Sequence, residues 1–444
     1  MRVVIVGAGE VGTNAARMLS GEGHRVVVID QNEGLVERTS QHLDALVMQG
    51  NGASPRVLRE AEVEKSDLLV AVTNTDEVNI VACLAAKSQG VPRTVARIHN
   101  PDYHDPKKPF SKDILGMDFV IRTEQMVADE ISSVLLVPGA VNVETFADGT
   151  IEVVEVVLKE DSPAVGQAVR DVNLPERSLI VGVVRHGETL IPKGDTVLEA
   201  RDHVFMICER RRVSEVVGAV VTDASPVRDA MILGGGRIGL LLALSLEKMG
   251  ISVKVIERDA GRARQVAAEL RRSLVLNDEG VSREFLLQER VDRMDAFIAV
   301  TPDDRTNLLA AMNARHLGAG LTIAGISRAE FSPLSEALGV DITISPRLLA
   351  AGAILRFVRR GEIAAVTLLE SGAQMIDLYV PEKCQVVGRP LAAVDFPRGA
   401  IVGAVLREGE FVVPTGKDVL EAGDEVVVFS VGSAVDEVER LFAP

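Results

Sequence analysis

The chain has 444 residues with 47% hydrophobic and 25% charged residues, and its formal net charge is −16. This length and composition predict about two to four ordinary globular domains. The acidic balance argues against nucleic acid or an anionic lipid surface as main partner, because both require a basic face. No apolar run approaches the roughly 20 residues of a membrane helix, and the N-terminus lacks a signal-peptide pattern. We therefore expect a cytoplasmic protein without direct membrane insertion.

A repeated glycine pattern organises the chain. Gly7-Ala8-Gly9-Glu10-Val11-Gly12 follows one apolar run, and Gly234-Gly235-Gly236-Arg237-Ile238-Gly239 follows another, 227 positions later. Asp30 and Glu257 end the next apolar runs at the same spacing. A single pattern of this kind is weak evidence. Two of them, each with its strand, helix and acidic residue, predict two dinucleotide-binding folds in tandem.

Apolar runs alternate with helical patterns in both repeats. In the first we expect a helix over 11–19 and strands at 3–6, 25–30, 43–48, 67–72, 94–98 and 118–121. In the second we expect strands at 230–233, 252–257, 273–276, 295–300, 321–326 and 341–344. Such alternation predicts a Rossmann-like α/β domain in each repeat, with a doubly wound parallel sheet.

A β-rich segment follows each Rossmann-like repeat. The stretch Pro192–Ala200 matches Pro414–Ala422, and apolar β-branched runs with Gly and Pro surround both. This composition predicts a small α+β module after each sheet, with a short helix near 165–172 in the first. We place the domains at 1–140, 141–223, 224–362 and 363–444.

Two segments, 123–137 and 347–358, carry a broad apolar stripe at helical spacing. Each follows the last predicted strand of its Rossmann-like repeat. The stripe can cover the sheet of its own repeat, or it can be exchanged with the neighbouring repeat. The sequence leaves both arrangements open.

The first glycine loop has the features that a bound dinucleotide requires. Gly7 allows a tight bend, Gly9 lets the backbone approach a pyrophosphate, and Gly12 lets the helix pack close to the strand. Asp30 would bond the adenosine ribose and repel a 2′-phosphate, which favours NAD(H) over NADP(H). The alternative is a structural glycine turn without a ligand.

Polar residues also follow the later strands, at the carboxyl ends where ligands bind in this fold. Asn51 can bond an adenine or serve as a turn residue, and Arg97 can contact a phosphate or form a structural ion pair. We predict NAD(H) contacts in the first repeat at Gly7, Ala8, Gly9, Glu10, Val11, Gly12, Asp30, Asn51, Gly52, Thr73, Asn74 and Arg97.

The second glycine loop differs in charge. Arg237 follows its second glycine, Arg258 follows Glu257, and Gly325 takes the place of Arg97. The added positive charge suits a phosphate-rich ligand such as ATP or ADP, and the alternative is an empty, structural fold. We predict contacts at Gly234, Gly236, Arg237, Gly239, Glu257, Glu279 and Thr301.

The sequence offers no catalytic or metal-binding group. A dehydrogenase needs an acid–base residue beside the nicotinamide. The seven histidines are scattered, and His99, after the fifth predicted strand, has no motif around it. The three cysteines are far apart and form no Cys-x-x-Cys pair. We therefore predict that the protein is not an enzyme, with an NAD-dependent oxidoreductase as the alternative.

The whole chain resembles the regulatory subunits of Trk-type potassium uptake systems, whose nucleotide-binding domains are called RCK or KTN domains. The resemblance rests on the first glycine loop, the run Ala71–Asn79, the triplet Ala96-Arg97-Ile98 and the doubled architecture. It implies a peripheral subunit at the inner face of the cell membrane that regulates a potassium-translocating pore subunit. NAD(H) and ATP or ADP would change its conformation, and it would form a homo-oligomer, either a dimer or a tetrameric ring.

Two features depart from the family pattern. The family often has Gly-Asp after the third strand, whereas this chain has Gly50-Asn51 in the first repeat and Asp278-Glu279 in the second. The second replacement implies that the turn glycine moves while an acid remains at Glu279. A sensing module of another transporter or exchanger is a further alternative function.

Overall fold

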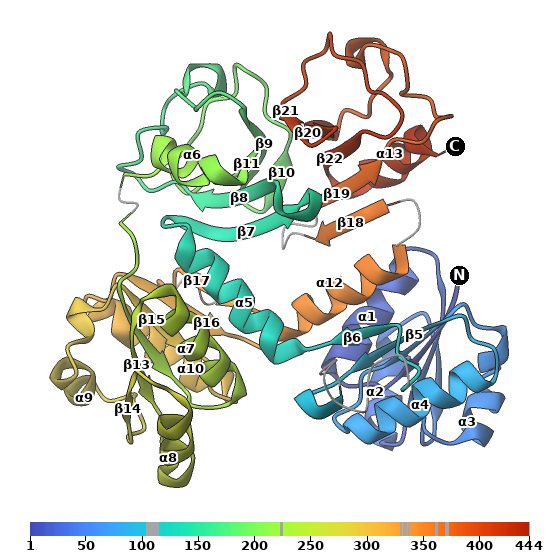
Figure 1. The fold of residues 1–444 in the computed structure, drawn as a ribbon, viewed down its shortest axis with the longest axis vertical. Helices are drawn as coiled ribbons and strands as arrows, with labels where there is room; N and C mark the ends of the chain where they lie inside the picture. Colours follow the sequence, from blue (N-terminus) through green and yellow to red (C-terminus); the bar gives the residue numbers. More distant parts are fainter. Residues whose placement is uncertain are drawn as a thin grey trace.

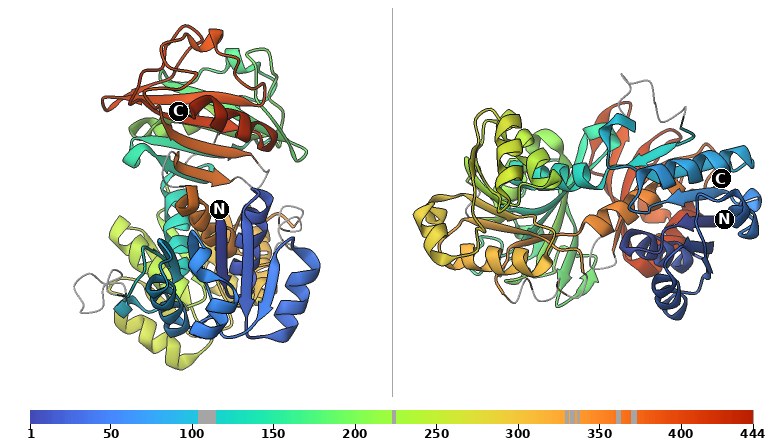
Figure 2. Two further views of the ribbon diagram at one scale, coloured as in Figure 1. Left: turned by 90° about the vertical axis from the view of Figure 1, so that its right-hand side faces the viewer. Right: turned by 90° about the horizontal axis from the view of Figure 1, so that it is seen from below.

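The computed structural model describes residues 1–103, 115–222, 225–328, 338–359, 363–368 and 373–443, together with Phe331 and Ser335. These residues form two six-stranded and two five-stranded sheets. The predicted boundaries near 223 and 362 lie outside the described residues, and the domain limits stay predictions. In Figures 1 and 2 the two five-stranded sheets form one layer above both six-stranded sheets.

The first six-stranded sheet, with its helices, is called unit one. Its strands are all parallel, in the order β3-β2-β1-β4-β5-β6. They are β1 Arg2–Val6, β2 Arg25–Asp30, β3 Leu46–Gln49, β4 Leu68–Ala71, β5 Arg93–Arg97 and β6 Phe119–Ile121. The helices are α1 Glu10–Gly21, α2 Glu33–His42, α3 Pro55–Glu60, α4 Asp76–Ser88 and α5 Thr123–Leu136. The central strands are buried on both faces, which accounts for their continuous apolar runs.

The second six-stranded sheet belongs to unit two and has the equivalent order, β14-β13-β12-β15-β16-β17. Its strands are β12 Asp229–Leu233, β13 Ser252–Ile256, β14 Leu274–Leu276, β15 Ala296–Ala299, β16 Leu321–Gly325 and β17 Ile342–Ile344. Its helices are α7 Arg237–Met249, α8 Ala260–Glu269, α9 Arg283–Gln288, α10 Asp304–His316 and α12 Pro346–Arg359. The predicted tandem of doubly wound sheets is confirmed, and every predicted strand is present.

The two smaller modules are antiparallel sheets, each with a terminal helix. The first contains β7 Ala140–Phe146, β8 Ile151–Val157, β9 Ser178–Arg185, β10 Glu188–Leu190, β11 His203–Glu209 and α6 Val213–Val220. The second contains β18 Ile363–Leu368, β19 Gln374–Tyr379, β20 Ala400–Arg407, β21 Glu410–Val412, β22 Glu425–Ser430 and α13 Val435–Phe442.

The short helix predicted near 165–172 is only a three-residue 3-10 helix, Val169–Asp171. The backbone bonds a neighbouring loop instead, with Val169 N donating to Thr196 O at 2.9 Å and Gly166 N donating to Leu198 O at 2.8 Å. These long-range bonds satisfy groups that an isolated helical turn would leave unpaired.

The two modules pack against each other through a shared apolar core. Phe205 and Phe429 lie with ring centroids 5.6 Å apart. Gly182 makes room for this contact, because a Cβ there would lie 2.3 Å from the Phe429 ring. The sheets of the two halves are therefore joined directly.

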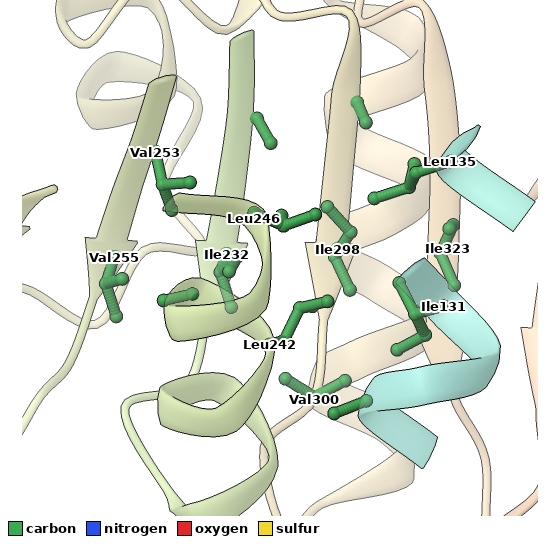
Figure 3. Packing of buried hydrophobic residues seen from close by; sticks show 14 of the residues in the cluster. Ile131, Leu135, Ile232, Leu242, Leu246, Val253, Val255, Ile298, Val300 and Ile323 are labelled. Carbon is green, nitrogen blue, oxygen red and sulfur yellow. The ribbon is translucent and has the colours of Figure 1, made fainter. Parts of the chain in front are cut away.

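The final helices of the two units are exchanged. Ile131 and Leu135 of α5 pack among Leu242, Leu246 and Ile298 of unit two (Figure 3). In the same way, α12 packs on α1 and on the core of unit one. Figure 1 shows α5 and α12 as a V beneath the modules, each leaning on the other unit. Each buried aliphatic side chain stabilises this arrangement by about 1.5–3 kcal/mol. No described helix combines the length and apolar character needed to span a membrane.

Candidate nucleotide sites

The first glycine loop connects β1 to α1 at the carboxyl end of the sheet. Gly7 has a φ of +110°, and a Cβ there would lie 3.0 Å from Thr73 N. A Cβ at Gly12 would lie 1.8 Å from the Gly7 carbonyl oxygen. Both positions therefore require glycine for packing. Gly9 has no atom within 4 Å of its would-be Cβ, so its open face allows a ligand to approach the backbone.

Asp30, at the end of β2, holds this loop. Its Oδ2 accepts the Ala8 N–H at 2.6 Å, and its Oδ1 accepts the Asn32 N–H at 2.8 Å. Each carboxylate oxygen can accept a second hydrogen bond, so the group retains capacity for the hydroxyls of a ribose. The start of α1 at Glu10 presents its first N–H groups beside this carboxylate.

Among the predicted contact residues after β3 and in the first turn of α1, one is exposed and two are buried. Asn51 is exposed, and its Oδ1 accepts the Ala53 N–H at 2.9 Å, as in an Asx turn. Gly52 is buried, and a Cβ there would lie 2.1 Å from the Val6 side chain. Val11 packs in the core that α12 enters. The Val11 side chain thus belongs to the packing of the exchanged helix.

Arg97, at the end of β5, reaches the end of β4. Its NH2 donates to Thr73 O at 3.0 Å and to Asn74 Oδ1 at 2.5 Å. Its buried Nε has no hydrogen-bond partner among the residues that the structure describes. Burial lowers the pKa of the Arg97 guanidinium, while the charges of Glu124 and Asp76 oppose that shift. Arg97 thus combines a structural role with an unused donor, so both of its predicted roles remain compatible with the structure.

Asn79, which was not among the predicted site residues, holds these strand ends together. Its Oδ1 accepts the Thr73 hydroxyl at 2.7 Å, and its Nδ2 donates to Thr73 O and Arg97 O. Asn307 makes the same bonds to Thr301 and Gly325 in unit two. The signal for it was the repeated spacing from Thr73 to Asn79 and from Thr301 to Asn307.

The second glycine loop repeats the first in detail. Gly234 has a φ of +113°, a Cβ at Gly239 would lie 1.9 Å from Gly234 O, and Gly236 is open. Glu257 Oε2 accepts the Gly235 N–H at 2.8 Å. Arg262, not predicted, donates from Nε to Gly235 O at 2.8 Å. Its position on α8, 27 residues from the loop, gave no sequence signal.

Other features of unit two differ from unit one. Gly280 packs against Leu233 as Gly52 packs against Val6, so a glycine keeps this place in both units. The expected change of the turn glycine concerns the preceding pair, where Asp278-Glu279 takes the place of Gly50-Asn51, and it stays a prediction. Glu279 and Arg237 are exposed.

The site of unit one continues into α5. Glu124, in the first turn of α5, lies 2.6 Å from His99 Nδ1. Burial opposes ionisation of Glu124, but the His99 contact, a backbone N–H and the charge of Arg237 outweigh it and lower the pKa of the carboxyl. Arg237 begins α7 of unit two. The Glu124 carboxylate, which contacts His99 of unit one, is thus also influenced by the charge of Arg237 in unit two.

The structure brings the predicted residues of each unit to one sheet edge, but their contacts with a nucleotide stay predictions. Within the described ranges, no three His, Cys, Asp or Glu side chains gather as metal ligands would. The arrangement can bind a dinucleotide by backbone N–H groups, a carboxylate for the ribose and, in unit one, an arginine.

Fold and sites together define a class of protein: tandem Rossmann-like nucleotide-binding units with exchanged helices, each followed by an antiparallel module. The TrkA-N domain family matches residues 3–123 and 230–346, and the TrkA-C domain family matches residues 153–218 and 375–443. The chain therefore belongs to the TrkA family of Trk system potassium uptake proteins.

Relatives match over their full length. The chain is 35% identical to Trk system potassium uptake protein TrkA homolog 1 of Methanosarcina mazei over 451 residues, covering 100% of both chains. It is 34% identical to Trk system potassium uptake protein TrkA of Vibrio alginolyticus over 454 residues, covering 100% of this chain and 99% of that protein.

Solved structures show the same fold at lower identity. The GsuK RCK domain has a TM-score of 0.64 at 17% identity and covers 99% of this chain and 94% of that one. The GsuK channel bound to NAD has a TM-score of 0.64 at 18% identity and covers 99% of this chain and 78% of that one. These likenesses confirm the RCK architecture.

Proposed function

We propose that the protein is a nucleotide-sensing regulatory subunit of a potassium-transporting membrane protein. Unit one binds NAD(H), unit two binds ATP or ADP, and the ligands bias the angle between the units. The relatives named as Trk potassium uptake proteins support the transport role, and the NAD-bound GsuK channel supports the cofactor. The subunit acts at the inner face of the membrane through a pore subunit and has no catalytic activity.

The observation that carries this proposal is the exchange of helices at the nucleotide loops. α1 begins directly after the first loop and packs on α12, while α7 begins after the second loop and packs on α5. A ligand on either loop therefore touches the joint between the units. It can shift the joint only by its differential affinity for two arrangements, typically about 1–3 kcal/mol.

Exposed apolar side chains support a homo-oligomer, a dimer or a tetrameric ring. Val81 and Leu84 on α4 are 45% and 40% exposed, and Leu309 on α10 is 56% exposed. Val81 and Leu309 occupy equivalent positions of the two units. Such matched apolar surfaces on outer helices suit contacts between copies.

Calorimetric titration with NADH, NAD, NADPH, ATP and ADP tests the proposal on the wild type and on Asp30→Ala and Glu257→Ala. We expect Asp30→Ala to lose only NAD(H) binding and Glu257→Ala to lose only ATP or ADP binding. Absence of binding by the folded wild type would contradict it. Co-purification with a potassium pore protein separates this role from that of a module for another transporter or exchanger.

One observation favours the alternative of an NAD-dependent oxidoreductase. His99 pairs with Glu124 at the carboxyl end of β5, and a carboxylate-oriented histidine is a common acid–base pair. Steady oxidation of NADH with a small carbonyl substrate, lost in His99→Gln, would establish this activity. Nucleotide binding without turnover would exclude it for the substrates tested.

A further inference from the structure

The exchange interface carries opposite charges at equivalent places. Arg347, in the first turn of α12, forms an ion pair with Glu10, its NH1 2.7 Å from Glu10 Oε2. In the other half, Glu124 takes the place of Arg347 at the start of α5, and Arg237 takes the place of Glu10. The two pairs of positions are therefore equivalent, and their charges are reversed. The effect of Arg237 on the Glu124 carboxyl agrees with this placement.

This pattern bears on which units pair. If unit one paired with unit one of a second copy, Glu124 of that copy would face Glu10. If unit two paired with unit two, Arg347 would face Arg237. Both like pairings bring equal charges together, whereas pairing of unlike units brings opposite charges together.

Packing along the same helices shows the same preference. Ser132 of α5 lies with its hydroxyl oxygen 3.2 Å from that of Ser245 on α7, and Ser132 is buried. The equivalent residues, Leu355 of α12 and Met18 of α1, belong to one apolar cluster. Pairing of like units would place a buried serine against Met18 and a leucine against Ser245. The Ser132 hydroxyl also donates to Ala128 O at 2.7 Å, so opposite Met18 it would keep that bond and lose only the contact with Ser245.

The far end of α12 adds a third asymmetric contact. Arg93 of unit one donates to Val358 O at 3.1 Å, and Phe119 stacks on Phe357 with ring centroids 5.3 Å apart. Unit two has Leu321 and Ile342 in the places of Arg93 and Phe119. The last turn of α12 would therefore lose its cationic and aromatic partners on another unit two.

We propose that these complementary features, above all the Glu10–Arg347 ion pair and the opposite charges of Arg237 and Glu124, direct each unit one to pair with a unit two and exclude pairing of like units between copies. The connecting modules then supply the unlike unit of the same chain at high effective concentration. The inference concerns assembly and holds whether or not nucleotides bind.

A pair of cysteines reports pairing of like units in the full-length protein. With Met18→Cys and Ser132→Cys, the two cysteines belong to different interfaces in the structure. They face each other only when unit one of one copy pairs with unit one of another, and oxidation then gives a covalent dimer. Cys384, which is half-buried, is changed to Ser in all variants. Cys83 and Cys208 stay, because burial raises the pKa of both thiols to about 12.

The decisive variant exchanges one pair, Glu10→Arg with Arg347→Glu. It keeps opposite charges at both places within the chain but makes both like pairings attractive as well. We expect about tenfold more covalent dimer than with the native charges, the factor that corresponds to roughly 1.4 kcal/mol. The mirror variant, Arg237→Glu with Glu124→Arg, creates the same attraction and replaces the first variant if that one does not fold.

Reversing all four charges is the matched control. This variant again disfavours pairing of like units, so covalent dimer returns to the wild-type amount. Ser132→Cys with Ser245→Cys reports the native interface by a disulfide within one chain and shows that each variant folds and oxidises. Equal dimer yields in the native and single-pair variants, or undiminished dimer after reversal of all four, would overturn the proposal.

Discussion

Units one and two place the same loop at the same end of the same sheet, yet they surround it with different side chains. A Cβ at Gly12 would lie 1.8 Å from Gly7 O in unit one, and a Cβ at Gly239 would lie 1.9 Å from Gly234 O in unit two. The close approach that requires glycine is therefore the same in both units. Arg97, by contrast, is replaced by Gly325, and Glu10 by Arg237. Steric requirements of the fold are thus kept in both copies, while the charges that a ligand or partner would meet have diverged.

The two modules show the same division. In the first module, Glu155 Oε1 lies 2.6 Å from His203 Nδ1 across neighbouring strands. In the second, Asp377 and Glu425 occupy the equivalent positions, so two acids replace an acid and a base. Burial and the charge of Glu425 raise the pKa of Asp377 to about 7. One scaffold therefore carries an acid–base pair in one half and, in the other, two carboxyl groups whose simultaneous ionisation is unfavourable.

The largest predicted effect concerns what the units share. Gly12→Val and Gly239→Val should each cost about 3 kcal/mol or more of unfolding free energy, because the new Cβ overlaps a backbone oxygen. Gly9→Ala and Gly236→Ala are the matched controls, since space is open there. Thermal and denaturant unfolding would measure both sets. A large cost for one unit and none for the other would break the equivalence.

The second prediction concerns the difference between the modules. The folded protein keeps a proton on Asp377 up to about pH 7, whereas an unfolded aspartate releases it near pH 4. The folded state thus binds more protons between these values, and stability falls as pH rises through them. We expect Asp377→Asn to remove about 4 kcal/mol of this fall, because each of the roughly three pKa units between these values corresponds to about 1.4 kcal/mol.

Urea unfolding from pH 4 to pH 8 measures how steeply the free energy of unfolding falls with pH. Glu425→His would reproduce the acid–base pair of the first module and should also reduce this fall. Glu155→Gln is the matched control, because Glu155 contacts a histidine and its loss leaves the Asp377–Glu425 repulsion in place. An unchanged slope in Asp377→Asn would assign the pH dependence to other groups.

The third prediction asks whether Arg97 accounts for the difference between the sites. Arg97→Gly makes unit one resemble unit two, and we expect about tenfold weaker NADH binding, as for loss of one charged hydrogen bond. Arg97→Lys keeps the charge but loses the forked geometry, so it should recover only part of the affinity. Calorimetry measures both. Unchanged affinity in Arg97→Gly would assign Arg97 to the structural bonds with Thr73 and Asn74.

Sequence patterns predicted the parts of this molecule that local rules determine. The strands were found because buried parallel strands read as continuous apolar runs, and the glycine loops because only glycine fits at Gly7 and Gly12. The apolar stripes of α5 and α12 were also found, but a stripe does not specify the surface that it covers. Exchange therefore had to come from the structure.

The site was predicted less completely, because several contacts join residues distant in sequence. Arg262 reaches the backbone oxygen of Gly235 from another helix, and no pattern marks such a bond. Asn79 was overlooked although its spacing from Thr73 is repeated in unit two. Val11 was included with the glycine loop, whereas its side chain packs in the core. Fingerprints identify a loop, but they do not separate ligand contacts from packing.

The smallest predicted effects compare the two charge pairs at the exchange interface. The Glu10 side chain is 64% exposed, so Glu10→Gln should lower the free energy of unfolding by about 0.5 kcal/mol or less. In high salt this difference should disappear, because salt screens exposed charges. Glu124 is 20% exposed and also holds His99, so Glu124→Gln should cost about 1 kcal/mol at pH 7. Chemical unfolding at low and high salt distinguishes the two costs.

Their pH dependence should differ as well. The pKa of Glu124 is lowered in the folded protein, so its contribution is present above the unfolded value and is lost as pH falls through the folded value. The difference between wild type and Glu124→Gln should therefore begin to shrink below about pH 4, near where an unfolded glutamate protonates, and vanish once the pH has fallen through the lower folded value. A difference that persists at acid pH would mean that Glu124 stabilises the joint by packing. The two halves would then differ at this contact in shape as well as in charge.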